Sequence, residues 1–220
     1  MVLPSLEVGG MERMTLDLSR TLARRGDLVS ITCTDTAGYL AGVAHRDGIP
    51  LHVVPPGRGG RGLLRHLREL RPDVVHLHMA PWLKTALGAR AAGAPLVTTL
   101  HGVPENVGPM GLRSMRLAAR ATRHVVLVAD SLSEWALERL RVAEHKVCTI
   151  LNGIDVEEYA PDGPARDLRG ELGIAGEAMI VGTVARLAPV KNQQLLIRAV
   201  AESRLPGVHV VLVGEGECRA

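Results

Sequence analysis

Short apolar runs alternate along the chain with longer segments in which leucine, methionine and alanine recur every three or four positions. Continuous apolar runs bounded by turn residues are typical of strands buried in a parallel sheet, and the longer spacing is typical of helices with one buried face. The alternation therefore predicts an α/β fold with parallel sheets covered on both faces. The predicted strands are residues 1–6, 28–34, 49–54, 73–77, 95–100, 124–128, 146–151, 179–184 and 208–213.

One stretch lacks both patterns and indicates a domain boundary. Residues 152–170 are rich in glycine, proline and aspartate, which favour turns over regular structure. We expect one domain over residues 1–160 and the start of a second over residues 161–220. Two strands and one long helix, predicted at 191–202, are too few to enclose a core, so we expect the second domain to be incomplete in this chain.

The segment 180–200 combines a strand, a positively charged connection and a helix. It reads IVGTVARLAPVKNQQLLIRAV, with Gly182 in the strand and with Arg186 and Lys191 in the connection. Ligands of open α/β sheets bind at the carboxyl ends of strands, where helix N-termini also favour anions. The segment predicts a site for phosphate or diphosphate, with Gly182 allowing a close backbone approach. The alternative is a solvated loop without a specific role.

A second candidate anion site lies near the start of the chain. Gly9 and Gly10 precede a helix whose apolar face is predicted to hold Met11, Met14, Leu18 and Leu22. Glycine lets backbone N–H groups approach an anion at a helix N-terminus. A simple tight turn is the alternative.

Histidines gather at two predicted strand ends. His101 and Gly102 follow the strand 95–100, a place suited to acid–base or hydrogen-bonding work, although the pattern alone slightly favours an ordinary loop histidine. His76 and His78 share one face of the strand before it. Two histidines at this spacing can ligate zinc, but no third ligand is evident, so we assign them to packing or a polar cleft and predict no metal site.

Composition narrows the function classes. The 220 residues are 46% hydrophobic, carry a formal charge of +3 and include 2% aromatic residues and no phenylalanine. Proteins that bind single-stranded nucleic acid rely on aromatic stacking, so we expect no nucleic-acid partner. The three cysteines lack metal-ligand spacing and are typical of a reducing compartment. With no signal peptide and no long apolar run, we expect a cytoplasmic protein.

Five arginines surround the helix predicted from Leu63, Leu64, Leu67 and Leu70. They form either a solvated basic face or a surface for an anionic acceptor or the inner face of a membrane. The sequence leaves both interpretations open. The arginines are Arg58, Arg61, Arg65, Arg68 and Arg71.

The ordered set of motifs resembles the GT-B glycosyltransferases, specifically the retaining family 4, or group 1, sugar transferases. The order and spacing of the pieces carry the resemblance, since each piece alone is short. The matching pieces are PSLEVGGMER, RPDVVHLHMAP, PLVTTLHG, KVCTILNGIDVEEYAP, VGTVARLAPVKNQQLLIRAV and VVLVGEGE.

This resemblance implies two Rossmann-like domains and transfer of a sugar, with retention, from a UDP- or GDP-type nucleotide diphosphate-sugar to an acceptor. Gly9 and Gly10 would face the diphosphate, Arg186 and Lys191 would hold it, and His101 would lie near the donor sugar. No Asp-x-Asp motif is present, so we expect these cations to serve in place of a metal and no cofactor beyond the donor. The acceptor stays open among lipids, glycans and small metabolites.

Two departures from the family pattern matter. The pair of glutamates that the family uses for sugar and ribose binding would lie beyond residue 220. Asn192 follows Lys191 where the family often has glycine, a change we expect to be harmless because it keeps the charge of the lysine. The competing hypotheses are a GT-B-like nucleotide-sugar epimerase and an inactive truncated fragment with only a binding role.

Overall fold

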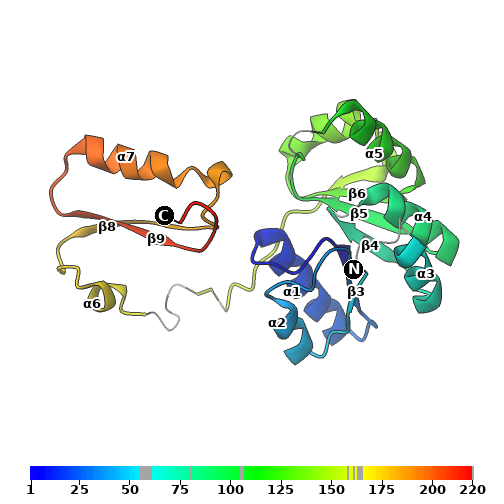
Figure 1. The fold of residues 1–220 in the computed structure, drawn as a ribbon, viewed down its shortest axis with the longest axis horizontal. Helices are drawn as coiled ribbons and strands as arrows, with labels where there is room; N and C mark the ends of the chain where they lie inside the picture. The colour runs from blue at the N-terminus through cyan, green and yellow to red at the C-terminus, as the bar shows by residue number, and fades with distance from the viewer. Residues whose placement is uncertain are drawn as a thin grey trace. The chain divides into compact units, whose positions relative to one another are not determined.

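A computed structural model describes residues 1–54, 61–79, 81–104, 107–157, 159–160, 162 and 166–219. The chain divides into two compact units, Met1–Ile154 and Asp155–Ala220 (Figure 1). The division falls a few residues before the boundary after residue 160 that composition predicts. Each unit is described by itself below.

The described strands of the first unit form one parallel sheet. Its order is β3-β2-β1-β4-β5-β6-β7, so the chain builds outward from β1 in one direction and then returns to its other side. The reversal lies between β1 and β4, and it creates a topological switch point at the carboxyl ends of these strands. The strands are β1 (Val2–Leu3), β2 (Ile31–Cys33), β3 (Leu51–Val53), β4 (Val75–His78), β5 (Leu96–Leu100), β6 (His124–Leu127) and β7 (Val147–Thr149).

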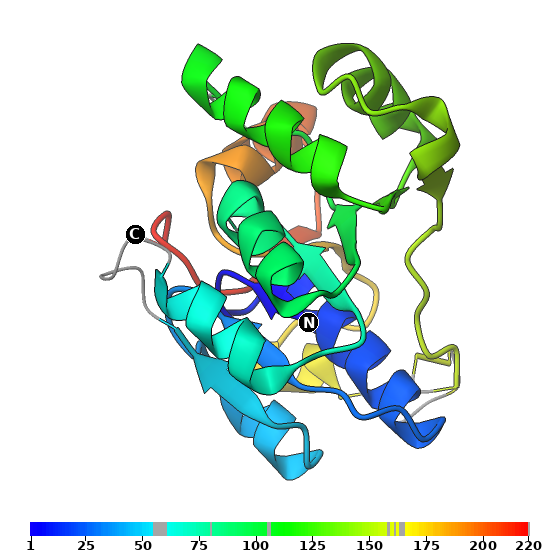
Figure 2. The ribbon, with the colours of Figure 1, turned by 90° about the vertical axis from the view of Figure 1, so that its right-hand side faces the viewer.

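Helices cover both faces of this sheet, as the sequence predicts. Neighbouring residues of a strand point to opposite faces, and Val2 and Leu3 accordingly belong to two separate buried clusters. Helices α1 (Gly10–Arg24) and α2 (Ala41–Arg46) contribute to the cluster of Leu3. The cluster of Val2 includes residues of α3 (Arg61–Leu70), α4 (Trp82–Ala92) and α5 (Pro109–Ala121), which lie side by side (Figures 1 and 2).

The layer of three helices packs closely and satisfies its buried indole. A Cβ on Gly88 of α4 would lie 2.8 Å from Cδ1 of Leu67 in α3, so the missing side chain allows the two helices to approach. The buried indole N–H of Trp82 donates to Oγ1 of Thr122 at 2.9 Å, just after α5. In contrast, the buried Oγ1 of Thr98 in β5 has no hydrogen-bond partner among the described residues.

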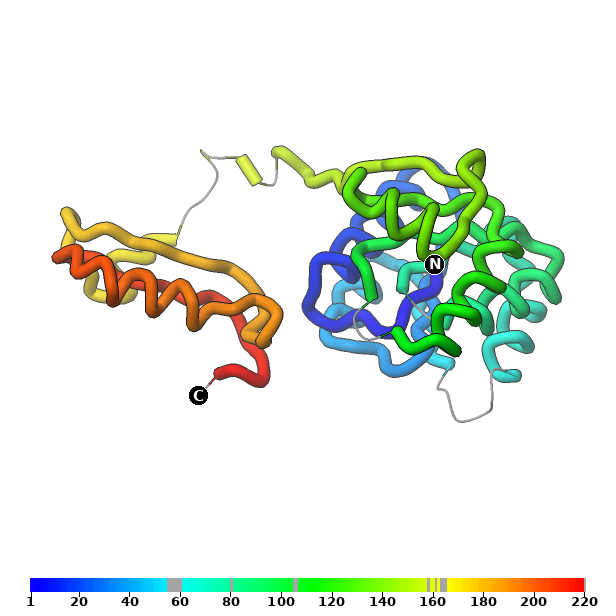
Figure 3. The backbone as a smooth tube through the Cα atoms, turned by 90° about the horizontal axis from the view of Figure 1, so that it is seen from above, coloured from blue at the N-terminus to red at the C-terminus, as the bar shows by residue number. Residues whose placement is uncertain are grey.

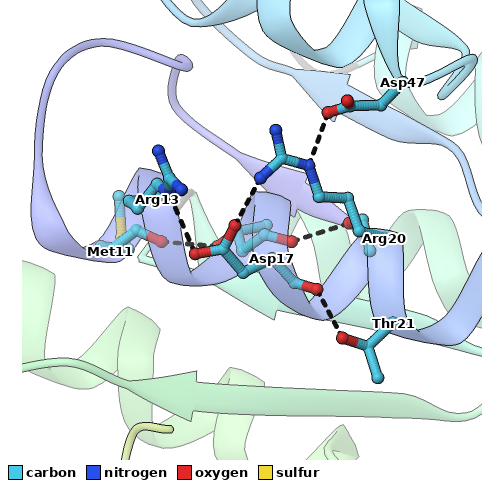
Figure 4. Close-up of polar contacts among 8 residues, drawn as sticks. Met11, Arg13, Asp17, Arg20, Thr21 and Asp47 are labelled. Carbon is cyan, nitrogen blue, oxygen red and sulfur yellow. Dashed lines mark hydrogen bonds and ion pairs between the residues drawn. The ribbon is translucent and has the colours of Figure 1, made fainter. Parts of the chain in front are cut away.

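On the other face, an ion-pair network ties α1 to the end of α2 (Figure 4). The Arg20 guanidinium lies 2.8 Å from a carboxylate oxygen of Asp17 and 2.6 Å from one of Asp47. Arg13 contacts the other oxygen of Asp17 at 3.0 Å. The hydrogen bond to Asp47 raises the pKa of Arg20, and the guanidinium bridges a carboxylate of α1 and one at the end of α2.

The second unit has a small sheet with little buried surface. Strands β8 (Met179–Val184) and β9 (Val208–Val213) pair in parallel, with α7 (Gln193–Ser203) between them in sequence and α6 (Leu168–Leu172) before them (Figure 3). Among the described residues of the unit, the buried ones are Ile174, Leu187, Ala188 and Gln193. Large apolar side chains of the strands stay exposed, including Val184 at 83% and Met179 at 58%.

Several predicted elements differ from the observed ones. The segment after β6 is not one regular α-helix: it has a 3-10 turn at Asp130–Leu132 and a π-helical turn at Trp135–Arg139. The six residues of α2 were not predicted, because a helix this short shows less than two turns of periodicity. Arg58 lies outside the described residues. None of the described helices is long and apolar enough to cross a membrane.

Candidate functional site

The polar residues singled out in the first unit share one edge of the sheet. Gly9 and Gly10 follow β1, His78 ends β4, and His101 follows β5. These three strands are neighbours and run parallel, so their carboxyl ends meet at the same edge. Val75 and Leu77 point into the large apolar cluster, which leaves His76 and His78 on the opposite face of β4.

Three histidines form a connected cluster at this edge. Nδ1 of His78 lies 3.0 Å from Nε2 of His101, and the ring centroids of His76 and His78 are 4.2 Å apart. Nε2 of His76 lies 2.7 Å from Oγ1 of Thr99, on the neighbouring strand. His78 is fully buried, and its Nε2 has no hydrogen-bond partner among the described residues.

Burial keeps these rings neutral at physiological pH. Desolvation lowers the pKa of His101 to about 4 and, together with nearby groups, that of His76 to about 4. Burial followed by the proximity of His76 and His101 lowers the pKa of His78 to about 2. A neutral imidazole both donates and accepts one hydrogen bond, so the cluster can orient a ligand without adding charge.

Gly9 and Gly10 lie at the N-terminus of the 15-residue helix α1, as predicted. Gly9 is the N-cap residue and, as a glycine, makes no side-chain cap of its own. A Cβ on Gly10 would meet no atom within 4 Å, so the space beside its backbone is open. The helix dipole favours an anion at this end, where the Glu12 carboxylate of the first turn already lies against Gly9.

The loop around Gly38 supports the segment between β1 and Gly9, a contact that the sequence did not predict. Gly38 has a φ of +78°, and a Cβ on it would lie 2.3 Å from the carbonyl carbon of Leu6. The N–H of Leu40 donates to the Leu6 carbonyl at 2.7 Å. In the sequence, Gly38 is visible only as a single glycine after the second predicted strand. Its contact with Leu6 could not be predicted, because the two residues come together only in the folded chain.

In the second unit, Arg186 and Lys191 lie in one short loop between β8 and α7. Both side chains are exposed, and a turn at Pro189–Lys191 precedes the helix. The buried side chain of Gln193 donates to the carbonyl oxygen of Arg186 at 2.9 Å. The loop backbone is thus fixed from the first turn of α7, while the two cations remain available to a ligand.

The segment after β9 also supports this loop. The N–H of Leu187 donates to the Glu215 carbonyl at 2.8 Å, and the N–H of Cys218 donates to the Leu187 carbonyl at 3.0 Å. A Cβ on Gly214 would lie 1.9 Å from the Ala185 carbonyl oxygen, and one on Gly216 would lie 2.2 Å from that of Leu187. Only glycine fits at these two positions, because each also has a positive φ.

Asn192 and Gly182 differ in what the structure requires of them. Asn192 adopts the left-handed conformation, with φ +48° and ψ +43°, which explains why asparagine can stand where glycine is common. Gly182 lies inside β8 rather than at its carboxyl end, and a Cβ there would meet the Val211 carbonyl at an ordinary 3.5 Å. The strand itself does not require glycine at residue 182, so its predicted ligand contact stays a prediction.

In the first unit, His78 and His101 lie at the same edge of the sheet as Gly9 and Gly10, where the carboxyl ends of β1, β4 and β5 meet. In the second unit, Arg186 and Lys191 lie on one loop. No cluster of three metal-binding side chains occurs in the parts of the chain that the structure describes. A doubly wound sheet with polar groups at its switch point, followed by a strand, a cationic loop and a helix, defines a protein of the Rossmann-like α/β class.

The chain belongs to glycosyltransferase family 4, because the profile of Glycosyltransferase Family 4 matches residues 8–158. It is 27% identical to a D-inositol 3-phosphate glycosyltransferase of Stackebrandtia nassauensis over 94% of this chain and 55% of that protein. It is 28% identical to the UDP-Gal:alpha-D-GlcNAc-diphosphoundecaprenol alpha-1,3-galactosyltransferase of Escherichia coli over 70% of this chain and 43% of that protein.

Solved structures confirm the predicted fold. The crystal structure of HepE from Anabaena in complex with UDP and glucose superposes with a TM-score of 0.76 at 22% identity, covering 98% of this chain and 61% of that one. The fold is therefore GT-B. The chain spans 55% of the length of the first curated relative and 61% of the length of HepE.

Proposed function

We propose that the protein transfers a sugar from a UDP-sugar to an acceptor, using Gly9, Gly10 and His101 of the first unit and Gly182, Arg186 and Lys191 of the second. The observation that carries the proposal is the cationic loop, whose backbone is fixed while both charges stay exposed. The family membership supports the reaction class. UDP is preferred over GDP because the Escherichia coli relative is named for UDP-Gal and the HepE structure contains UDP.

The proposed chemistry follows from where charge develops. Breaking the bond between sugar and phosphate leaves negative charge on the diphosphate leaving group. Arg186 and Lys191, with the N–H groups at Gly9 and Gly10, would stabilise that charge as it forms. These fixed cations supply the compensation that a divalent metal provides elsewhere, so the proposal includes no further cofactor. Retention of configuration is part of the proposal on the family resemblance alone.

The donor site can be tested by calorimetric titration of the chain with UDP, with GDP as the comparison. Lys191→Ala and Arg186→Ala should each weaken UDP binding by about tenfold to a hundredfold, since a hydrogen bond to a charged group contributes roughly 1.5–3 kcal/mol. Arg198→Ala, which removes an exposed cation from α7 in the same unit, is the matched control and should bind UDP normally. Equal UDP affinity in all three variants, or no binding to the unmodified chain, would contradict the proposal.

Transfer is tested separately from donor binding. With UDP-glucose and a panel of lipid, glycan and polyol acceptors, NMR of the product should show the anomeric configuration of the donor. His101→Ala should keep UDP binding and lose most of the transfer. A product of inverted configuration would refute retention, and a donor isomerised without any acceptor would instead identify a nucleotide-sugar epimerase.

A further inference from the structure

The contact between His78 and His101 requires that one ring donates and the other accepts. Their facing atoms, Nδ1 of His78 and Nε2 of His101, are 3.0 Å apart, a hydrogen-bonding distance that needs one proton between them. A neutral imidazole carries its single N–H on one nitrogen, so choosing the donor fixes the proton positions of both rings.

The burial of His78 decides between the two arrangements. If His101 donated, the proton of His78 would sit on Nε2, which is buried and has no partner among the described residues. A buried N–H without an acceptor is rarer and more costly than a buried acceptor without a donor. The favoured arrangement places the proton of His78 on Nδ1 and leaves its enclosed Nε2 as a bare acceptor.

The third histidine does not change this result. Nε2 of His76 lies 2.7 Å from Oγ1 of Thr99, and its ring plane is tilted by 35° against that of His78. The hydrogen bonds recorded for these rings run to Thr99 and between His78 and His101, and neither partner is a carboxylate. Burial also lowers the pKa of each ring, which keeps all three neutral.

We propose that His78 is a positioning residue that donates from Nδ1 to Nε2 of His101 and so fixes His101 with its own proton on Nδ1. The half-buried ring of His101 then presents a neutral N–H donor to an oxygen atom of the ligand. Its Nε2 lone pair is occupied, so His101 orients that oxygen and does not abstract a proton. The identity of the oxygen as one of a nucleotide-sugar rests on the proposed function, whereas the proton positions do not.

Histidine side-chain NMR of the ¹⁵N-labelled chain at neutral pH tests the proton positions directly. Long-range ¹H–¹⁵N spectra distinguish the two nitrogens of each neutral ring, and single His→Gln variants assign the signals. We expect a proton bound to Nδ1 of His78, a coupling across the hydrogen bond to Nε2 of His101, and a protonated Nδ1 on His101. A proton bound to Nε2 of His101 would overturn the proposal.

Variants then test whether His78 sets the state of His101. His78→Asn keeps an N–H donor near the position of Nδ1 and should preserve the protonated Nδ1 of His101. His78→Ala removes the donor and admits water, so the fraction of His101 protonated on Nε2 should rise. His76→Asn is the matched control on the same strand face, and it should leave His101 unchanged. An unaltered His101 spectrum in His78→Ala, or an equal change in His76→Asn, would refute the positioning role.

These outcomes separate the inference from the proposed function. The spectra are recorded without nucleotide or acceptor, so failure of UDP binding or transfer leaves the proton assignment intact. Conversely, a chain that transfers sugar while His101 carries its proton on Nε2 would keep the proposed function and discard the role of His78.

Discussion

Thr98 and Thr122 are each 1% exposed, yet their hydroxyl groups have opposite surroundings. Oγ1 of Thr98 has no partner among the described residues, whereas Oγ1 of Thr122 accepts from the Trp82 indole and donates to the Ala118 carbonyl. Thr98→Val should raise the free energy of unfolding by about 1 kcal/mol, because it removes an unpaired buried polar group. Thr122→Val should lower it by about 1–3 kcal/mol, because the indole N–H loses its acceptor.

Urea denaturation of the two valine variants measures both effects with the same chemical change. Thr122→Ser retains the hydroxyl group and should recover most of the loss. If Thr98→Val destabilised the chain as much as Thr122→Val, the hydroxyl of Thr98 would have a partner in solution.

Stability should fall as the pH drops below about 6.5, the ordinary pKa of histidine. The unfolded chain then binds protons that the folded chain excludes, since burial lowers the pKa of His78 to about 2 and that of His101 to about 4. Unfolding is favoured wherever the unfolded state binds more protons, by about 1.4 kcal/mol per pH unit for one fully excluded proton. The urea midpoint should be lower at pH 5 than at pH 6. In His78→Asn, the loss of unfolding free energy between these pH values should be smaller by about 1.4 kcal/mol per pH unit.

At the residue scale, the sequence indicated which residues belong to the candidate site better than it indicated which residues they contact. Motif spacing singled out His101, Arg186 and Lys191, but it assigned His78 to packing or a polar cleft. Two histidines that end consecutive strands are expected to meet in a parallel sheet, so the pair could have been predicted from the strand order. The proton arrangement could not, because it depends on which nitrogen is enclosed.

Among the elements, the loop that carries Arg186 depends on two glycines after β9. Gly214→Ala or Gly216→Ala would place a methyl group within about 2 Å of the Ala185 or Leu187 carbonyl oxygen. The loop must then move away from the segment after β9, so we expect a large loss of UDP affinity together with a lower melting temperature. Gly176→Ala is the matched control, because its Cβ would meet no atom within 4 Å. Unchanged UDP binding in both glycine variants would show that the loop does not need this support.

The predicted elements succeed where periodicity alone decides the structure and fail where hydrogen bonds intervene. Helix α1 was predicted correctly, but its most buried residues are Thr15, Leu16 and Ser19 rather than the predicted methionines and leucines. The hydroxyl groups of Thr15 and Ser19 donate to carbonyls four residues earlier, at 2.8 and 2.7 Å, and can therefore be buried. A hydropathy pattern treats threonine and serine as polar, so the buried face that it predicts for α1 is displaced around the helix from the observed one.

On the scale of the whole molecule, the two units differ in how much apolar surface they bury. The first has two buried clusters, whereas the four buried residues among those described in the second are Ile174, Leu187, Ala188 and Gln193. Local stability follows buried apolar contacts, so amides of β8 and β9 should exchange with deuterium faster than those of β4 and β5. Mass spectrometry of peptic fragments after deuterium labelling resolves the two units. Equal protection of the two pairs of strands would mean that β8 and β9 are covered in solution.

The positions of the two tryptophans determine which unfolding transition their fluorescence reports. The chain has two tryptophans, Trp82 and Trp135, and both belong to the first unit. Intrinsic tryptophan emission is therefore a selective probe of that unit, and its change on denaturation follows the layer around α4. Circular dichroism sums the backbone of both units. A dichroism transition that begins before the emission transition would thus reveal, without any label or added chromophore, that the second unit opens first.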